Sequence, residues 1–249
     1  MRVATLGAGR MGRGLAVVFA FAGHKVDMVD FKARDAEAFA AFAAETRKEI
    51  ADTFGILCRI GLMRAEHVAP LTARVHVVPL AQAAGAFGEA DYIFEALPEV
   101  LELKRAGLAE ASRMARPDTI IASTTSTILV DDMSGAVADP GRFINAHWLN
   151  PAFLVPLVEL SPGKATRPDV TDGIKAMLEG IGKKPVVCAA TPGYIVPRIQ
   201  GMAMNEAARM VEEGVASAED IDKAITHGFG FRFAILGLLE FIDWGGGDI

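Results

Sequence analysis

The sequence predicts an α/β fold, in which a mainly parallel sheet covered by helices precedes a smaller all-helical domain. Three observations favour it. A glycine-rich strand–helix–strand pattern occupies the first thirty residues, apolar strands alternate with helices up to residue 190, and the pattern is helical afterwards. Such alternation is typical of parallel sheets, because each crossover helix covers one face. We expect a first domain over residues 1–190 and a second over residues 191–249.

The first thirty residues follow the order strand, glycine turn, helix, strand, acid. Val3–Leu6 is a short apolar run, and Gly7, Gly9 and Gly12 after it form the motif G-x-G-x-x-G. An apolar stripe at helical spacing follows, and a second apolar run then ends in Asp30. This order is typical of a Rossmann-type dinucleotide-binding unit. The plainer alternative is a strand–helix turn whose glycines are incidental.

Each residue of this turn has a physical task in binding a dinucleotide. Gly7 permits the tight turn, Gly9 lets a pyrophosphate approach the backbone, and Gly12 lets the helix pack close to the strand. The N–H groups at the helix start, where Arg10 and Met11 lie, attract the phosphates. These five residues are therefore the predicted pyrophosphate site.

Asp30 is the predicted ligand of the adenosine ribose. Its carboxylate accepts hydrogen bonds from the ribose hydroxyls and repels a 2′-phosphate, which favours NAD over NADP. Lys32 and Arg34 follow closely and weaken that preference a little. We therefore expect NAD as the cofactor.

Further strands and helices alternate up to residue 190. The Ala-rich stretch 33–53 is predicted to form a long solvent-facing helix. Gly55 and Gly61 are expected to interrupt the helices that follow. In parallel sheets ligands bind at the carboxyl ends of strands, so the polar segments after strands are candidates for the site. The expected strands cover 74–78, 92–96, 119–122, 143–147, 157–160 and 185–188. The other expected helices cover 55–72, 79–88, 100–114 and 170–181. The candidate segments at strand ends are Glu95–Glu99, Ser123–Thr127 and His147–Asn150.

The sequence pattern predicts that the second domain is helical throughout. A helical pattern starts at Tyr194 and Gly214 marks its end, while the segment 217–220 resembles the start of another helix over 221–226. The apolar faces are large for a domain of this size. We therefore expect this domain to pack on a second copy of the chain, which makes a homodimer.

Composition and charge exclude several classes of protein. The net charge is −6 and no Lys/Arg cluster could follow a phosphate backbone, which argues against nucleic acid as a partner. No apolar run is both uncharged and long enough to span a bilayer, and residues 1–23 carry the glycine pattern of a folded unit. Cys58 and Cys188 lie in apolar surroundings, which indicates reduced thiols and a cytoplasmic protein. The histidines are scattered singly, so no metal site is expected.

The segment Asn145–Pro151, followed by Val155–Glu159, resembles the signature of the L-3-hydroxyacyl-CoA dehydrogenase superfamily. The other motifs of that superfamily occur in order and span essentially the whole chain. The resemblance implies an NAD-dependent oxidoreductase that acts on a CH–OH group of a small-molecule substrate. Those motifs are the G-x-G-x-x-G unit with Asp30, Glu95–Glu99 with Lys104, Ala122–Ser126, Gly193–Arg198, Asn205–Ala207 and Glu213–Ala216.

The resemblance also implies roles for individual residues. His147 would be the catalytic base, which suits an imidazole because its ordinary pKa is near neutral. Glu159 would accept the other imidazole N–H and fix the tautomer. Ser126 would donate a hydrogen bond to the reacting oxygen of the substrate. Three further residues match positions at the nicotinamide and ribose end of the cofactor, namely Glu99, Lys104 and Asn150.

Each of these residues also has a plainer interpretation. A lone histidine at a strand end is often structural, the Ser123–Thr127 segment could be only a helix cap or turn, and Lys104 could lie on a solvated helix face. Glu95 could be a strand-end residue without chemistry. Glu159 stands in an apolar strand, where an unpaired carboxylate is costly to bury, so a partner such as His147 is expected.

Departures from the superfamily pattern bear on the substrate. Thr124 and Pro197 each stand where the superfamily commonly has Asn, and proline has no side-chain donor for a substrate carbonyl. The segment 228–234 is more similar to the hydroxy-acid branch, which includes the gulonate dehydrogenase/lambda-crystallin and carnitine dehydrogenase types. Arg232 in that segment could pair with a free carboxylate. The predicted substrate-binding residues are therefore Ser126, Pro197 and Arg232.

Three functions follow from these patterns. The first is oxidation of a short-chain L-3-hydroxyacyl-CoA such as 3-hydroxybutyryl-CoA, in fatty acid or butanoate metabolism. The second is oxidation of a free 3-hydroxy acid, and the third is a non-catalytic NAD-binding protein. Superfamily members usually continue with further helices after the stretch that matches Asp243–Ile249. The helical domain is therefore expected to be incomplete, through truncation or because this member is short.

Overall fold

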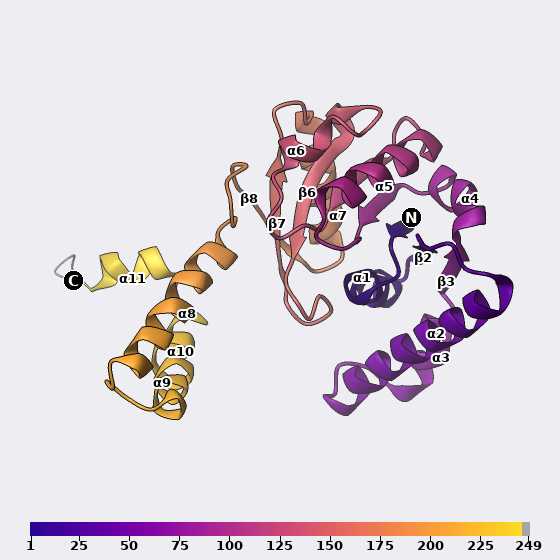
Figure 1. Cartoon of the computed structure of the whole chain (residues 1–249). Coiled ribbons are helices and arrows are strands. Elements are labelled where there is room, and N and C mark those ends of the chain that lie inside the picture. Colours follow the sequence, from indigo (N-terminus) through magenta and orange to yellow (C-terminus); the bar gives the residue numbers. More distant parts are fainter. Residues whose placement is uncertain (246–249) are drawn as a thin grey trace. The chain divides into compact units, whose positions relative to one another are not determined.

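Figure 1 shows the computed structural model of the chain, which describes residues 1–245. The chain divides into two compact units, one over Met1–Ile195 and another that begins at Val196. Each unit is described by itself below. The end of the predicted second domain, residues 246–249, lies outside the described residues.

The first unit contains an eight-stranded sheet in the order β3-β2-β1-β4-β5-β6-β7-β8. All neighbouring strands pair in parallel except β6 and β7, which are antiparallel. The prediction of a mainly parallel sheet is confirmed. The strands are β1 (Arg2–Leu6), β2 (Lys25–Asp30), β3 (Val75–Pro79), β4 (Tyr92–Glu95), β5 (Ile120–Ser123), β6 (Phe143–Trp148), β7 (Leu157–Pro162) and β8 (Lys184–Val187).

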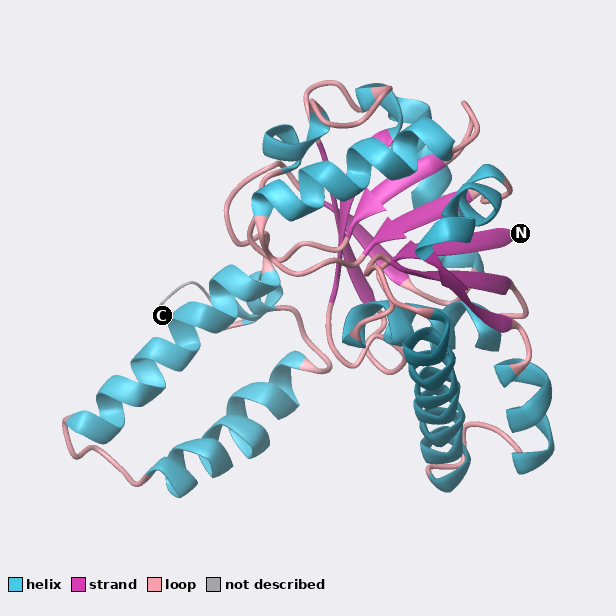
Figure 2. Ribbon diagram, turned by 45° about the vertical axis from the view of Figure 1, so that its right-hand side comes forward, coloured by secondary structure: helices cyan, strands magenta, loops and turns pink. Residues whose placement is uncertain are grey.

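Helices cover both faces of this sheet, as Figure 2 shows. Two apolar cores result, one on each face, and β1 supplies both: Val3 belongs to one core, while Ala4 and Leu6 belong to the other. Successive side chains of a strand point to opposite faces, so an apolar run without alternation is the pattern of a strand covered twice. The longer helices of the unit are α1 (Arg10–Phe21), α2 (Ala36–Arg59), α5 (Leu101–Met114) and α7 (Pro168–Gly180), and the shorter ones α3 (Val68–Thr72), α4 (Ala83–Gly88) and α6 (Val130–Ser134).

The helix α2 corrects one sequence expectation. It continues through Gly55, where an interruption was predicted, and ends at Arg59. Its buried side chains include Ile50, Phe54 and Leu57, which flank the glycine on both sides. Tertiary packing of this face offsets the roughly 1 kcal/mol that a glycine costs inside a helix. Gly61, by contrast, adopts φ +78° just beyond the helix and does end it.

The second unit is helical over its described residues. It contains α8 (Val196–Glu212), α9 (Ala218–Ala224), a π-helical turn (Ile225–Gly230), α10 (Phe231–Phe233) and α11 (Leu238–Trp244). Ser217 caps α9, because its hydroxyl accepts a hydrogen bond from the N–H of Asp220 at 3.1 Å. The prediction of a helical segment after the sheet is confirmed.

Within residues 1–245 no single helix has the length and apolar character needed to cross a membrane. One pair of helical segments, Ala218–Phe233 and Leu238–Trp244, has that length and composition when the two are taken together, and they are bent by 82° relative to each other.

Candidate active site

The glycine turn joins β1 to α1 and leaves its backbone bare. Gly7 adopts φ +112°, a conformation that side chains disfavour. A Cβ at Gly12 would lie 2.2 Å from the carbonyl oxygen of Gly7, so only glycine lets the helix approach the turn this closely. A Cβ at Gly9 would meet no atom within 4 Å, which means that this position faces open space. A phosphate could therefore reach the backbone at Gly9.

A cleft of about 540 Å³ opens at this turn, along the carboxyl ends of the parallel strands. The arrangement fits a dinucleotide, because a bare helix N-terminus and an acid at the end of β2 line the same cleft. Gly12 packs beneath the turn instead. The predicted site residues that the cleft brings together are Gly7, Gly9, Arg10, Met11, Asp30, Glu99, Lys104, Ser126 and Asn150, and Thr124 lines it as well.

Asp30 is paired with a cation of its own chain. The Nε of Arg34 donates to Oδ2 of Asp30 at 2.5 Å, and the Arg34 guanidinium lies 4.3 Å from the centre of the Phe42 ring. Arg34 and Lys32 both line the cleft. Arg34 therefore largely compensates the negative charge of Asp30, the predicted ligand of the ribose. The closeness of these two residues in the sequence had indicated this effect only weakly.

Glu95 and Lys104 form a buried ion pair at the end of β4. The Nζ of Lys104 lies 2.9 and 3.1 Å from the two carboxylate oxygens of Glu95, and donates to the carbonyl of Leu97 at 3.1 Å. Ser123, at the end of β5, donates to Glu95 at 2.5 Å. Lys104 is only 1% exposed, so the alternative of a solvated helix face is wrong. Buried charges require such partners.

Glu99 holds the hydroxyl-rich loop that follows β5. Its Oε1 accepts hydrogen bonds from the backbone N–H groups of Ser126 and Thr127, at 3.0 and 2.9 Å, and from the hydroxyls of Thr125 and Thr127. Lys104 lies 3.3 Å from the other oxygen. Partial burial raises the pKa of Glu99, but the hydrogen bond from Thr125, the charge of Lys104 and the bonds from Thr127 lower it to about 2. The loop is thus fastened to an ionised carboxylate.

His147 and Glu159 face each other across β6 and β7. The two residues are register partners in the antiparallel pair, and Nδ1 of His147 lies 2.7 Å from Oε2 of Glu159. Oε1 of Glu159 accepts a hydrogen bond from the N–H of Ile195 at 2.9 Å. His147 is 4% exposed and Glu159 is fully buried. The carboxylate therefore leaves Nε2 as the nitrogen that can exchange a proton.

The ends of β5 and β6 bring this pair close to the loop. In the parallel pairing Ser123 lies opposite Asn145, so the chain after Ser123 runs beside His147. Asn150, three residues beyond the histidine, lines the cleft. The buried pair and the dinucleotide cleft therefore lie at the same edge of the sheet.

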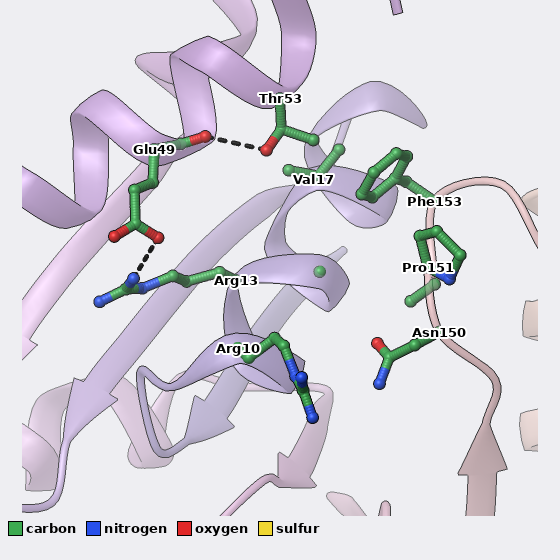
Figure 3. Close-up of a pocket in the computed structure, with 10 residues that line it drawn as sticks. Arg10, Arg13, Val17, Glu49, Thr53, Asn150, Pro151 and Phe153 are labelled. Carbon is green, nitrogen blue, oxygen red and sulfur yellow. Dashed lines mark hydrogen bonds and ion pairs between the residues drawn. The ribbon is translucent and has the colours of Figure 1, made fainter. Parts of the chain in front are cut away.

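A second cavity of about 520 Å³ adjoins the cleft and shares Arg10, Arg13 and Asn150 with it. In Figure 3 the loop that carries Asn150, Pro151 and Phe153 faces side chains of α1 and α2 across this cavity. Arg13 forms an ion pair with Glu49 and donates to the carbonyl of Ala8 at 3.1 Å. Glu49 thus compensates the charge of Arg13 on the wall of the cavity.

Two residues of the site carried no role in the sequence analysis. Tyr194 stacks on the imidazole of His147, with ring centroids 4.8 Å apart and an interplanar angle of 3°. Asn145 stands two residues before His147 and therefore on the same face of β6. The position of Tyr194 in the Gly193–Arg198 motif was a signal, but its contact with a strand about fifty residues earlier was not visible in the sequence.

The remaining predicted site residues belong to the second unit. Pro197 lies in the first turn of α8, and Arg232 lies in α10 with its guanidinium 4.4 Å from the centre of the Phe241 ring. Across the described part of the chain, no group of three or more His, Cys, Asp or Glu side chains could hold a metal ion.

Family models match both parts of the chain. Residues 2–191 match the 3-hydroxyacyl-CoA dehydrogenase NAD binding domain, and residues 193–248 match the C-terminal domain of the same family. The prediction of NAD as the cofactor is thereby confirmed.

Curated relatives include enzymes named for two kinds of substrate. The chain is 34% identical over 248 residues to 3-hydroxyadipyl-CoA dehydrogenase of Escherichia coli K12, which covers 99% of this chain and 49% of that protein. It is 35% identical over 246 residues to L-carnitine dehydrogenase of Burkholderia mallei, which covers 98% of this chain and 73% of that protein. The chain thus spans about half of the first relative and about three-quarters of the second.

Solved structures agree with these relatives. The chain resembles 5-formyl-3-hydroxy-2-methylpyridine 4-carboxylic acid 5-dehydrogenase, with a TM-score of 0.84 at 28% identity over 99% of this chain and 76% of that one. It also resembles (S)-3-hydroxybutyryl-CoA dehydrogenase from Ralstonia eutropha, with a TM-score of 0.81 at 29% identity over 92% and 77% of the two chains. The family models match almost the whole chain, and these relatives and structures all bear the name of a dehydrogenase. The chain therefore belongs to the 3-hydroxyacyl-CoA dehydrogenase family.

Proposed function

We propose that the chain is an NAD-dependent dehydrogenase that oxidises the 3-hydroxyl group of a short-chain L-3-hydroxyacyl-CoA, such as 3-hydroxybutyryl-CoA, to the 3-keto product. The observation that carries the proposal is the buried His147–Glu159 pair, with Nδ1 and Oε2 2.7 Å apart, at the edge of the sheet where the dinucleotide cleft opens. A base held in one tautomer beside a nicotinamide site is the arrangement that alcohol oxidation requires.

His147 is the proposed catalytic base. Its Nε2 accepts the hydroxyl proton of the substrate, while the carboxylate of Glu159 accepts a hydrogen bond from Nδ1–H. That hydrogen bond fixes the tautomer and stabilises the imidazolium that forms, as the carboxylate of a hydrolase triad does. The pair is buried, which strengthens the interaction between the two charges.

Ser126 is the proposed ligand of the reacting substrate oxygen. Its backbone is fastened to Glu99, whose ionised carboxylate is in turn 3.3 Å from Lys104. The hydroxyl of Ser126 is thus presented from a loop anchored to the core of the sheet. The cleft residues would hold NAD, which would supply the hydride acceptor for C3 of the substrate.

The cleft residues have corresponding tasks in cofactor binding. Gly7, Gly9, Arg10 and Met11 present the bare helix N-terminus to the pyrophosphate, and Gly12 makes that close approach possible. Asp30 accepts hydrogen bonds from the adenosine ribose. Glu99, Lys104 and Asn150, which also line the cleft, are the proposed neighbours of the nicotinamide and its ribose.

A free 3-hydroxy acid is the alternative substrate. Arg232 offers a guanidinium for a carboxylate, and Pro197 lacks the side-chain donor that a thioester carbonyl would use. Among the relatives, L-carnitine dehydrogenase supports this alternative, while 3-hydroxyadipyl-CoA dehydrogenase supports an acyl-CoA. A non-catalytic NAD-binding role is the third candidate.

A substrate panel tests these candidates. NADH formation would be followed by absorbance with L-3-hydroxybutyryl-CoA, 3-hydroxyadipyl-CoA, L-carnitine, gulonate and free 3-hydroxybutyrate. We expect the highest kcat/KM with a 3-hydroxyacyl-CoA. A preference for a free acid would replace the acyl-CoA by the alternative, and NADH binding without turnover on any member of the panel would favour the non-catalytic role.

The proposal extends to assembly and location. We propose a homodimer that packs through the second unit, where large apolar side chains such as Met202, Ile235 and Leu239 are more than 70% exposed. Cys58 and Cys188 are free thiols, which suits the reducing conditions of the cytoplasm. An acyl-CoA substrate would place the reaction in fatty acid metabolism.

A further inference from the structure

Tyr194 occupies a position that its backbone disfavours. It is the one residue other than glycine with positive φ among residues 1–245, at φ +45°, and it directly follows Gly193. Side chains with a Cβ seldom adopt this conformation unless surrounding contacts hold them there. Tyr194 is 6% exposed, and it contacts His147, Asn145 and Thr125, which belong to the first unit.

The ring and the hydroxyl of Tyr194 contact different parts of the site. The ring stacks in parallel on His147, with centroids 4.8 Å apart. The hydroxyl donates to the backbone carbonyl of Thr125 at 3.0 Å and accepts from Nδ2 of Asn145 at 3.1 Å. Burial raises the pKa of this phenol, so the hydroxyl keeps its proton and remains a donor. One side chain thus joins the base to the loop that carries Ser126.

Neighbouring contacts complete this connection. Ile195, the next residue, donates its N–H to Glu159 at 2.9 Å, so Tyr194 and its neighbour hold both members of the buried pair. Asn145 also donates to the carbonyl of Ile128 at 3.0 Å, beyond the far end of the loop. The Tyr194 hydroxyl therefore adds a direct link between the loop and the ring that stacks on His147, beside the bond from Asn145 to Ile128.

We propose that Tyr194 is a positioning residue, which sets the location of the His147 imidazole relative to the Ser126 loop. The proposal rests on the proposed function, because base and loop must act on the same substrate hydroxyl. A misplacement of about 1 Å between reacting groups can lower a rate by about a hundredfold. Tyr194 does not itself take the hydroxyl proton of the substrate, because its own hydroxyl donates to the carbonyl oxygen of Thr125.

Tyr194→Phe is the decisive variant, because it keeps the stacked ring and removes only the hydroxyl. We expect kcat to fall roughly tenfold with KM for the substrate within about twofold, since the hydroxyl contacts the loop and not the substrate. Tyr92→Phe is the matched control. It removes the other tyrosine hydroxyl of the chain, which donates to the carbonyl of Gly173 at 3.4 Å, and it should leave kcat and KM unchanged.

NMR of the free protein gives a readout that does not depend on turnover. Ring-current shifts of the His147 imidazole protons should persist in Tyr194→Phe and disappear in Tyr194→Leu, while the amide of Ser126 should move in both variants. Circular dichroism and the Tm check that the variants remain folded. Wild-type kcat in Tyr194→Phe, or a loss explained by unfolded protein, would overturn the positioning role. If the wild type turns over no substrate, the proposed function fails instead, and an unmoved Ser126 amide would then overturn the present proposal.

Discussion

Individual side chains carry the chemistry proposed for this chain, and His147 is the first of them. The amide of His147→Gln can still donate a hydrogen bond to Glu159, so the buried carboxylate keeps a partner. Because a general base contributes about 10²- to 10⁴-fold, we expect kcat to fall within that range while the Kd for NADH stays within about twofold. Fluorescence titration and steady-state rates measure the two effects. Unchanged turnover would refute the assignment of the base.

Glu99 makes the free energy of unfolding depend on pH. Its pKa in the folded protein is about 2, below the usual 4.5, so its contribution is complete above pH 4.5 and disappears as the pH falls through about 2. We expect Glu99→Gln to make the acid destabilisation between pH 5 and about 2 shallower than in the wild type. Urea unfolding midpoints across this range measure the slope. Glu102→Gln, on an exposed acid nearby, should leave the slope as it is.

Arg34 sets the balance of charge at the ribose end of the cleft. Its pairing with Asp30 offsets the repulsion that the carboxylate would exert on a 2′-phosphate. We therefore expect Arg34→Leu to weaken NADPH binding about tenfold or more, and NADH binding by less than about threefold. Fluorescence titrations with both nucleotides test this. Equal losses for the two would show that Arg34 has no part in the discrimination.

At the scale of elements, two glycines of the β1–α1 turn have different tasks. Gly12 lets the helix pack close to the turn, and Gly9 leaves room for a phosphate to approach the backbone. Gly12→Ala would place a Cβ 2.2 Å from the Gly7 carbonyl oxygen, and such overpacking costs about 1–3 kcal/mol of unfolding free energy. Gly9→Ala meets no atom within 4 Å, so it should leave stability within about 0.5 kcal/mol but weaken NADH binding, since the methyl occupies the phosphate's path. Urea unfolding and NADH titration of both variants test the contrast. Equal stability of the two variants would contradict it.

The antiparallel pair β6–β7 explains why one strand end carries the base and its acid together. Register partners across a pair have adjacent side chains on the same face, and here the partners are His147 and Glu159. The other neighbour of β6 is parallel to it, which brings the Ser123–Thr127 loop to the same edge. The reversal of direction at β7 thus serves the site, although the sheet is otherwise parallel.

At the scale of the whole molecule, the described part of the second unit exposes large apolar side chains. The helix α8 contains no buried residue, and Met202, Met204 and Leu239 are each more than 60% exposed. We expect a dimer in solution, which light scattering during size exclusion would detect as twice the mass of 26.4 kDa. Met202→Glu should shift the mass toward the monomer, and the exposed Glu212→Gln should not. A monomeric wild type at micromolar concentration would contradict the dimer.

The local pattern of residues was sufficient for much of the architecture. The alternation of apolar strands and helices predicted the parallel sheet, and the glycine motif with Asp30 predicted an NAD site, because both depend on residues close together in the chain. The helix α2 shows the limit of such patterns. Gly55 is a helix breaker in isolation, but the buried residues around it keep it helical.

The tertiary structure alone decided which side chains meet. Glu99 fastens a loop about 27 residues further on, and Tyr194 reaches His147 and Thr125 from a segment about 47 and 69 residues later. The pairing of Asp30 with Arg34 depends on a side-chain direction that sequence proximity leaves open. Propensity and periodicity describe one segment at a time, whereas these contacts arise only when strand order and register bring distant segments to one edge of the sheet.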